Sequence, residues 1–152
     1  MTKMLNEFKF RSEVGLTEWP KNESFELYTG ISMMSNKIKE LDEGFVSVKL
    51  KILLLGGDGS MTISRTSKFF EGLAALKVFI LMDGNLSLHA LHNLTDLRAL
   101  RLKQCKLEDI SSLVKLKKLV SLSFRGSNIR ELPEEIGVQG CLITLDLSEC
   151  KE

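Results

Sequence analysis

Pairs of large apolar residues recur along the chain at nearly constant intervals, with a single residue between the two members of each pair. The pairs open at Ile31, Leu53, Phe79, Leu100, Leu122 and Leu145. Successive openings are 22, 26, 21, 22 and 23 residues apart. Because side chains alternate between the two faces of a strand, both members of a pair point the same way. The pattern therefore predicts six short strands, each with one apolar row facing inward.

The fullest copy of the repeated unit runs from Leu94 to Leu107 and reads L-x-x-L-x-x-L-x-L-x-x-C-x-L, the leucine-rich-repeat pattern. One such unit cannot bury its leucines alone, whereas stacked units share a continuous core. We predict an α/β fold: a leucine-rich-repeat solenoid, or horseshoe, with a parallel β-sheet on the concave face and short helices or turns on the convex face. Residues 1–28 are predicted to form an N-terminal linker or cap segment, and residues 29–152 about six repeats.

The segments between the predicted strands carry signals of short helices or irregular turns. Residues 67–76 and 111–119 have the apolar spacing of a helix. Within residues 132–137, Pro133 stands where a helix would begin. These segments are expected to cover the convex side of the sheet.

Small polar residues are expected in the turn after each strand, where their side chains can bond the backbone. Cys105, Asn128 and Cys150 are assigned that position. The glycine-rich segment 56–59 also follows a strand, and we considered a phosphate-binding loop there. It lacks the Lys-Ser/Thr that such a loop requires, so we interpret it as a plain turn.

The outward-facing strand positions form the default binding surface of the predicted sheet. The second and third repeats are apolar there, and the later ones are polar to basic. The predicted partner-binding residues are Ile52, Leu54, Val78, Ile80, Met82, Arg101, Lys103, Ser121, Ser123, Arg125, Thr144 and Asp146. A solvated face does not expose so many apolar side chains together. Two explanations stay open: this patch docks against a neighbouring domain, or it is covered by the first 25 residues or simply degenerate.

The basic stripe formed by Arg101, Lys103 and Arg125 is expected to meet an acidic partner surface. Elsewhere the composition is balanced, with 43% hydrophobic residues, 27% charged residues and a formal net charge of +1. This balance gives no electrostatic case for nucleic acid or an anionic membrane. No apolar run is long enough to span a bilayer. The N-terminus lacks the apolar core of a secretory signal, and three cysteines suit reduced thiols, so we expect a cytoplasmic protein.

No group of residues predicts catalysis or a cofactor. His89 and His92 are spaced like metal ligands, but no further ligand lies near them in sequence, so we interpret them as ordinary surface or half-buried histidines. Cys141 has no recognisable histidine partner that would make it a nucleophile. The lysines of segment 115–119 suit a solvated helix better than a membrane-binding patch. We therefore expect no enzyme, no cofactor and no metal site.

Several segments together resemble one protein family. Residues 15–20 read Gly-Leu-Thr-Glu-Trp-Pro, and residues 28–38 read Tyr-Thr-Gly-Ile-Ser-Met-Met-Ser-Asn-Lys-Ile. With residues 69–78, 132–137 and 145–150, they resemble plant nucleotide-binding leucine-rich-repeat disease resistance proteins of the coiled-coil class. The resemblance covers the chain from about Phe8 onward, and its N-terminal junction is more specific than the repeats.

The resemblance implies an interaction module of an intracellular plant immune receptor. Such a module recognises pathogen effectors or guarded host proteins and holds the receptor inactive through contact with its own nucleotide-binding domain. The chain departs from the family because it has neither a P-loop nor the Met-His-Asp motif, and Gln139 stands where a leucine is expected. No capping repeat follows Cys150, so we expect a fragment of such a receptor. The alternative is a free-standing leucine-rich-repeat adaptor or scaffold with an unrelated protein partner.

Overall fold

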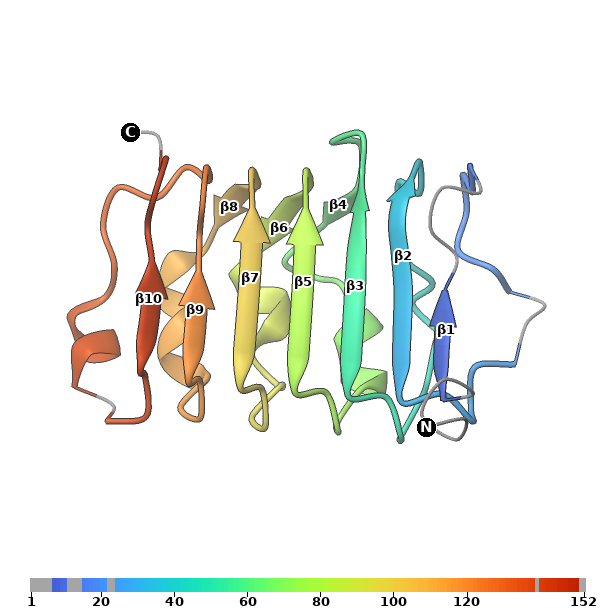
Figure 1. The fold of residues 1–152 in the computed structure, drawn as a ribbon, viewed down its shortest axis with the longest axis horizontal. Coiled ribbons are helices and arrows are strands. Elements are labelled where there is room, and N and C mark those ends of the chain that lie inside the picture. The colour runs from blue at the N-terminus through green and yellow to red at the C-terminus, as the bar shows by residue number, and fades with distance from the viewer. Residues whose placement is uncertain (1–6, 11–14, 22–23, 139, 151–152) are drawn as a thin grey trace.

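A seven-stranded parallel sheet organises the computed structural model, which describes residues 7–10, 15–21, 24–138 and 140–150. Its strands follow one another across the sheet in chain order (Figure 1). They are β1 (Phe8–Phe10), β2 (Gly30–Asn36), β3 (Ile52–Gly57), β5 (Val78–Met82), β7 (Ala99–Lys103), β9 (Ser121–Ser123) and β10 (Thr144–Asp146). The α/β class and the parallel sheet predicted from the sequence are therefore confirmed.

The register of the sheet places the six predicted pair openings in a single row. Ile31 is the Cα partner of Leu53, which is also the partner of Phe79. The row continues from Phe79 to Leu100, from Leu100 to Leu122, and from Leu122 to Leu145. The interval of 21 to 26 residues between successive pairs is thus the length of chain that leads from one strand to the aligned position on the next strand.

Alternation within the strands separates the core from the surface. Leu53, Leu55, Phe79 and Leu81 are fully buried, whereas the large side chains that alternate with them in β3 and β5 are only half-buried. Burial of one such side chain contributes roughly 1.5–3 kcal/mol. The core therefore lies on one side of the sheet, and the other side, which we call the open face, is left to the solvent or to a partner.

The buried side of the sheet is covered by a second, smaller sheet and by four short 3-10 helices. The small sheet contains β4 (Thr62–Ile63), β6 (Asn85–Ser87) and β8 (Lys106–Glu108). The helices are η1 (Phe69–Gly72), η2 (Leu88–Leu91), η3 (Ile110–Lys115) and η4 (Glu134–Gly137). The helical segments expected at residues 67–76 and 111–119 are thus shortened to 3-10 helices of four and six residues, and η4 begins directly after Pro133 as predicted. The small sheet was not predicted, because its strands have only two or three residues.

The N-terminal segment adds an unpredicted strand to the sheet. Its residue Lys9 is paired with Ile31, so a lysine occupies the position that holds a buried apolar residue in the next five strands. The Lys9 Nζ lies 5.6 Å from the centre of the Tyr28 ring. The ring of Phe8 packs against Gly30 so closely that a Cβ at Gly30 would lie 2.1 Å from it. A strand with a lysine at its inward position thus forms this edge of the sheet, within the segment predicted as a linker or cap.

Aromatic side chains join the N-terminal segment to the core. Trp19 is buried and meets Phe45 and Phe69 edge to face at 5.1 and 5.2 Å between ring centroids. Phe69 in turn contacts Phe70, which contacts the strand residue Phe79. Such aromatic pairs contribute about 0.5–1.5 kcal/mol each beyond their buried area. This cluster fixes the segment before β2 against the first two crossings of the chain.

The turns after the strands repeat one backbone conformation. A residue with positive φ follows each pair opening by four positions in five of the six predicted repeats. These residues are Ser35, Asp83, Gln104, Gly126 and Glu149, with φ between 53° and 72°. Positive φ is uncommon for residues other than glycine, so its recurrence at one position shows that the chain turns in the same way each time.

Cysteines bond the turns to the preceding strand, as expected for Cys105 and Cys150. The Cys105 Sγ donates to the Leu81 carbonyl oxygen at 3.4 Å, and the Cys150 Sγ donates to the Phe124 carbonyl oxygen at 3.1 Å. Burial raises the pKa of the Cys105 thiol to about 11, so this thiol stays protonated and available as a donor at neutral pH.

The assignment of Asn128 to this turn position is wrong, because Ser127 occupies it. The buried Ser127 hydroxyl donates to the Leu102 carbonyl oxygen at 2.6 Å and accepts from the Cys105 amide at 3.0 Å. Asn128 is exposed, and its Oδ1 accepts from the Leu107 amide of β8 at 2.7 Å. Both cysteines lie three residues after the second apolar residue of their pair. The same count from Phe124 leads to Ser127.

The last strand leaves its inward-facing side chains exposed. Leu145 and Leu147 are 44% and 41% exposed, whereas the equivalent Leu122 and Phe124 of the preceding repeat are buried. β10 is the last strand of the sheet, so no further described strand packs beside these leucines (Figure 1). Gln139, where the sequence departs from the repeat pattern, lies outside the described residues. Among the described residues, no helix is long and apolar enough to cross a membrane.

Candidate interaction face

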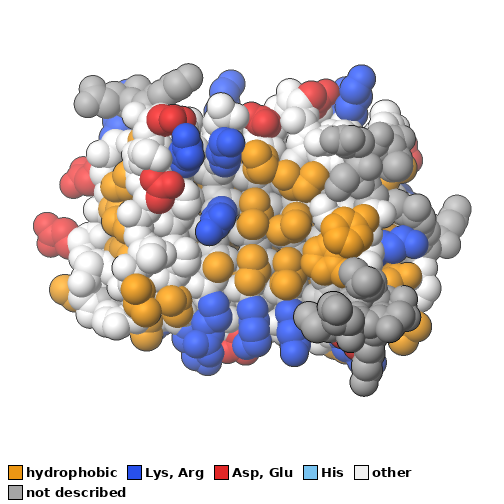
Figure 2. Space-filling view, viewed as in Figure 1, with side chains coloured by type: hydrophobic (Ala, Val, Ile, Leu, Met, Phe, Trp, Pro, Cys, Tyr) orange, Lys and Arg blue, Asp and Glu red, His pale blue; other side chains and the backbone are white. Residues whose placement is uncertain are grey.

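The middle of the open face is apolar. Side chains from β3 and β5 form a continuous patch, which we call the apolar field. Its members are Ile52, Leu54, Val78, Ile80 and Met82. The register places Ile52 beside Val78 and Leu54 beside Ile80, and all five side chains are half-buried (Figure 2). These are five of the twelve predicted partner-binding residues, and the structure brings them together.

The N-terminal segment does not bury the apolar field with its described residues. Phe8 lies against Gly30 of β2, one strand away from the field, and its ring lies tilted against that of Phe10, with 4.5 Å between the ring centroids. Phe10 itself is 63% exposed. Residues 1–6 and 11–14 lie outside the described residues. Of the two explanations for the apolar positions, cover by the chain's own N-terminus therefore finds no support in the residues that the structure describes.

The basic stripe is only partly available to a partner. The Arg125 guanidinium donates to the Glu149 carboxylate at 2.9 Å. This hydrogen bond raises the pKa of Arg125 and lowers the pKa of Glu149. Arg101 and Lys103, on β7, form no ion pair with any described residue. The stripe therefore presents two cations, and sequence reasoning missed Glu149 because its position depends on the positive-φ turn after β10.

Asp146 places a negative charge at the same end of the open face. Its carboxylate accepts from the Ser148 amide at 2.9 Å and from the Ser123 hydroxyl at 3.3 Å. Ser148 is the main reason why the pKa of Asp146 lies below its usual value, first through its side-chain hydroxyl and then through its amide. Asp146 is therefore ionised at neutral pH, which makes this end of the face mixed in charge.

An open hollow of about 560 Å³ lies between the apolar field and the polar end of the face. Ile80 and Met82 line one side, and Arg101 and Lys103 line another. Ser121, Ser123, Arg125, Thr144 and Asp146 complete the wall. All of its lining residues except Arg125 belong to β5, β7, β9 or β10, so the hollow is a feature of the sheet surface. It can receive a side chain that is apolar at one end and acidic at the other.

The other candidate residues lie apart from this face. His89 and His92 belong to or follow η2, with rings stacked at 4.5 Å, and the described residues include no group of three or more His, Cys, Asp or Glu placed to hold a metal ion. In the turn after β3, the Asp58 carboxylate accepts from the Ser60 amide at 3.1 Å. This carboxylate would repel a phosphate. The interpretation of segment 56–59 as a plain turn is wrong for Gly56 and Gly57, which pair with neighbouring strands as the last residues of β3.

Comparison with protein families and with curated proteins finds no match. The resemblance to plant resistance proteins therefore rests on the segments quoted from the sequence, and the functional argument rests on the open face.

Proposed function

We propose that the chain is a leucine-rich-repeat solenoid whose open face binds another protein. The repeat interpretation is supported by the near-constant interval of the apolar pairs, their alignment in one row, and the recurring turn with positive φ. In this proposal the open face is the concave face of the horseshoe, and the 3-10 helices and small sheet form the convex side.

The apolar field is the observation that carries the binding function. It contains five large apolar side chains on a face that no described segment covers (Figure 2). Contiguous apolar patches on the surface of a protein mark interaction sites, because their exposure to water is unfavourable. A protein partner fits better than a small molecule, because the field is a broad part of the sheet surface.

The class of receptor follows from the resemblance. We propose an interaction module of a plant intracellular immune receptor, which acts in the cytoplasm and recognises a pathogen effector or a guarded host protein. Contact of the same face with the receptor's own nucleotide-binding domain would hold the receptor inactive. The second candidate is a free-standing adaptor or scaffold. Mapping the transcript upstream of Met1 separates the two, because a continuing reading frame with a P-loop supports the receptor and a transcription start just before Met1 supports the adaptor.

Substitution of the apolar field tests the binding function. The double variant Leu54→Ser, Ile80→Ser removes two central apolar side chains, and proximity labelling in plant cells measures which proteins lie near the full chain. Val46→Ser with Val48→Ser is the matched control, because these valines are 61% and 74% exposed in a loop outside the strands. We expect labelling of specific partners to fall at least about tenfold in the field variant and to stay unchanged in the control. Equal labelling by both variants, with both folded, would refute the proposal.

A further inference from the structure

A row of basic side chains borders the open face where the strands begin (Figure 2). Lys51, Lys77 and Arg98 immediately precede β3, β5 and β7, and we call them the strand-start row. The backbone aligns them, because the Lys77 amide donates to the Lys51 carbonyl oxygen and the Arg98 amide to the Lys77 carbonyl oxygen, both at 2.8 Å. The row is thus fixed by the same ladder that forms the sheet.

The strand-start row keeps its positive charge. None of its three members forms an ion pair with a described residue. The acid nearest in sequence is Asp96, two residues before Arg98, and its carboxylate is bound by the Lys118 ammonium at 2.8 Å. After Lys118, the charges of Lys77 and Arg98 also lower the pKa of Asp96, so this one carboxylate partly offsets the row, which stays net positive. Like charges held side by side disfavour one another, so a row of three is stabilised by an anionic partner.

The apolar field lies directly along this row. Ile52 and Val78 are the first residues of β3 and β5, so each follows a member of the row in the chain. Beside the β5 edge of the field, Arg101 and Lys103 of β7 border the hollow of about 560 Å³. A partner that covers the field therefore meets cations along one long border and at one end.

We propose that the open face binds an acidic amphipathic helix of its partner, laid across the strands with its carboxylates on the strand-start row. This inference rests on the protein-binding function proposed above. Neighbouring strands are about 4.8 Å apart, and one turn of an α-helix rises about 5.4 Å. Carboxylates on three successive turns therefore meet Lys51, Lys77 and Arg98 in turn, with a mismatch that flexible lysine and arginine side chains absorb. The apolar stripe of the helix covers the field.

An anionic membrane would present a similar chemistry, but the surface fits it less well. Membrane-binding surfaces insert apolar side chains into the bilayer. The side chains of the apolar field are half-buried and adjoin a hollow, so they receive groups from a partner rather than project into one. The peptide test below therefore includes vesicles as a competing surface.

A synthetic peptide of about 16 residues tests the proposal on the full chain. It carries leucines at helical spacing on one face and glutamates on three successive turns of the adjoining flank. Fluorescence anisotropy measures its Kd beside that of a scrambled peptide of the same composition. We expect the amphipathic peptide to bind at least about tenfold more tightly, and its affinity to fall as salt is added. Equal affinity for the two peptides overturns the proposal.

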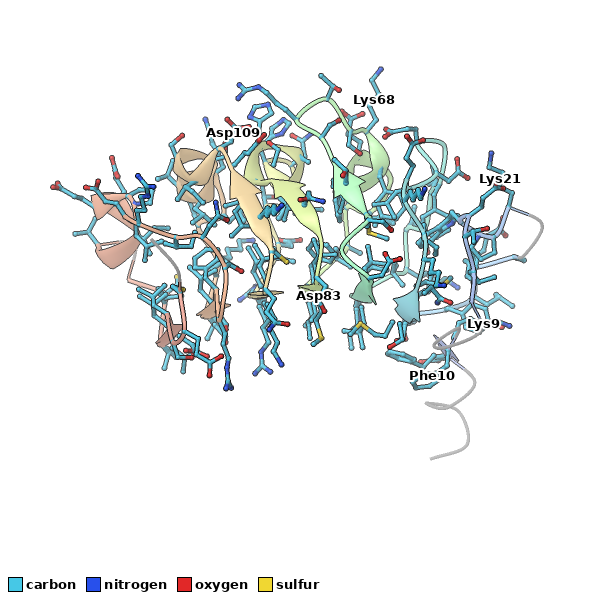
Figure 3. All side chains as sticks on the ribbon, turned by 90° about the horizontal axis from the view of Figure 1, so that it is seen from above. Lys9, Phe10, Lys21, Lys68, Asp83 and Asp109 are labelled. Carbon is cyan, nitrogen blue, oxygen red and sulfur yellow. The ribbon has the colours of Figure 1, made fainter. Side chains whose placement is uncertain are left out.

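Matched charge variants identify the binding border. Lys51→Gln, Lys77→Gln, Arg98→Gln together should weaken peptide binding at least about tenfold. The control Lys68→Gln, Lys106→Gln, Lys115→Gln removes the same charge from residues before η1, in β8 and in η3, and should leave the Kd unchanged. Lys68 lies on the helix-bearing side of the molecule, opposite Phe10 on the open face (Figure 3). An equal effect of both triple variants overturns the proposal.

The field variant separates this inference from the proposed function. If Leu54→Ser, Ile80→Ser abolishes peptide binding and the strand-start variant does not, the face binds protein but not by an acidic flank. If neither variant changes the Kd, the face itself is not the binding surface. Binding to phosphatidylserine vesicles that the strand-start variant loses, without competition by the peptide, would assign the row to a membrane and overturn the helix proposal.

Discussion

Single polar side chains hold the turns of this chain together, and Ser127 shows this most clearly. Its buried hydroxyl donates to the Leu102 carbonyl oxygen of β7 and accepts from the Cys105 amide in the turn after β7. Its replacement leaves both groups unpaired in the core, which costs about 1–3 kcal/mol. We expect Ser127→Ala to lower the free energy of unfolding by this amount in urea denaturation, and Ser127→Cys to lower it less, because cysteine occupies the same position in neighbouring turns. The control Ser64→Ala, at an exposed position, should change it by less than about 0.5 kcal/mol.

The three cysteines should differ sharply in reactivity. The nucleophile is the thiolate, and the raised pKa and burial of Cys105 keep its thiol both protonated and inaccessible. Cys141 is exposed. We expect iodoacetamide at pH 8 to modify Cys141 first and Cys105 only after the chain unfolds, as measured by peptide mass spectrometry over time. Modification of Cys105 at the rate of Cys141 in the folded protein would contradict the burial of this turn.

At the scale of elements, the strands of the large sheet could be predicted from the sequence, except for β1 at its N-terminal edge. The central strands each bury an apolar pair, which the period-two pattern predicts. β1 was missed because Lys9 stands at the inward position, so Phe8 and Phe10 face the open side. The apolar field followed from alternation alone. The strand-start row did not, because its alignment depends on the register between strands that are 21 to 26 residues apart in the chain.

The close packing of β1 on Gly30 gives a test of the N-terminal edge. A methyl group at this position would lie 2.1 Å from the Phe8 ring, so Gly30→Ala should displace the ring and loosen β1. Overpacking of this kind costs about 1–3 kcal/mol. We expect hydrogen exchange to show lost protection in β1 with protection kept in β5 and β7. Gly137→Ala is the control, because nothing lies within 4 Å of a Cβ there.

For the whole molecule, one sheet separates a closed side from an open one. The closed side holds the aromatic and leucine core, and the open side combines the apolar field with the strand-start row and the cations of β7 (Figure 2). In the proposed function, a protein partner covers the apolar field on the open side. At the C-terminal edge, Leu145 and Leu147 form a second, smaller group of exposed apolar side chains.

A photo-crosslinking residue placed at Ile80 in the full chain tests the binding role of the open face most directly. Ile80 lies in the middle of the apolar field and lines the hollow, whereas Val46 is an exposed apolar residue outside the strands. Irradiation of cells that express each version, followed by mass spectrometry, identifies what lies within reach of each position. We predict a specific protein crosslink at Ile80 and none at Val46. The same crosslinks at both positions, or none at Ile80 in a folded chain, would contradict the account.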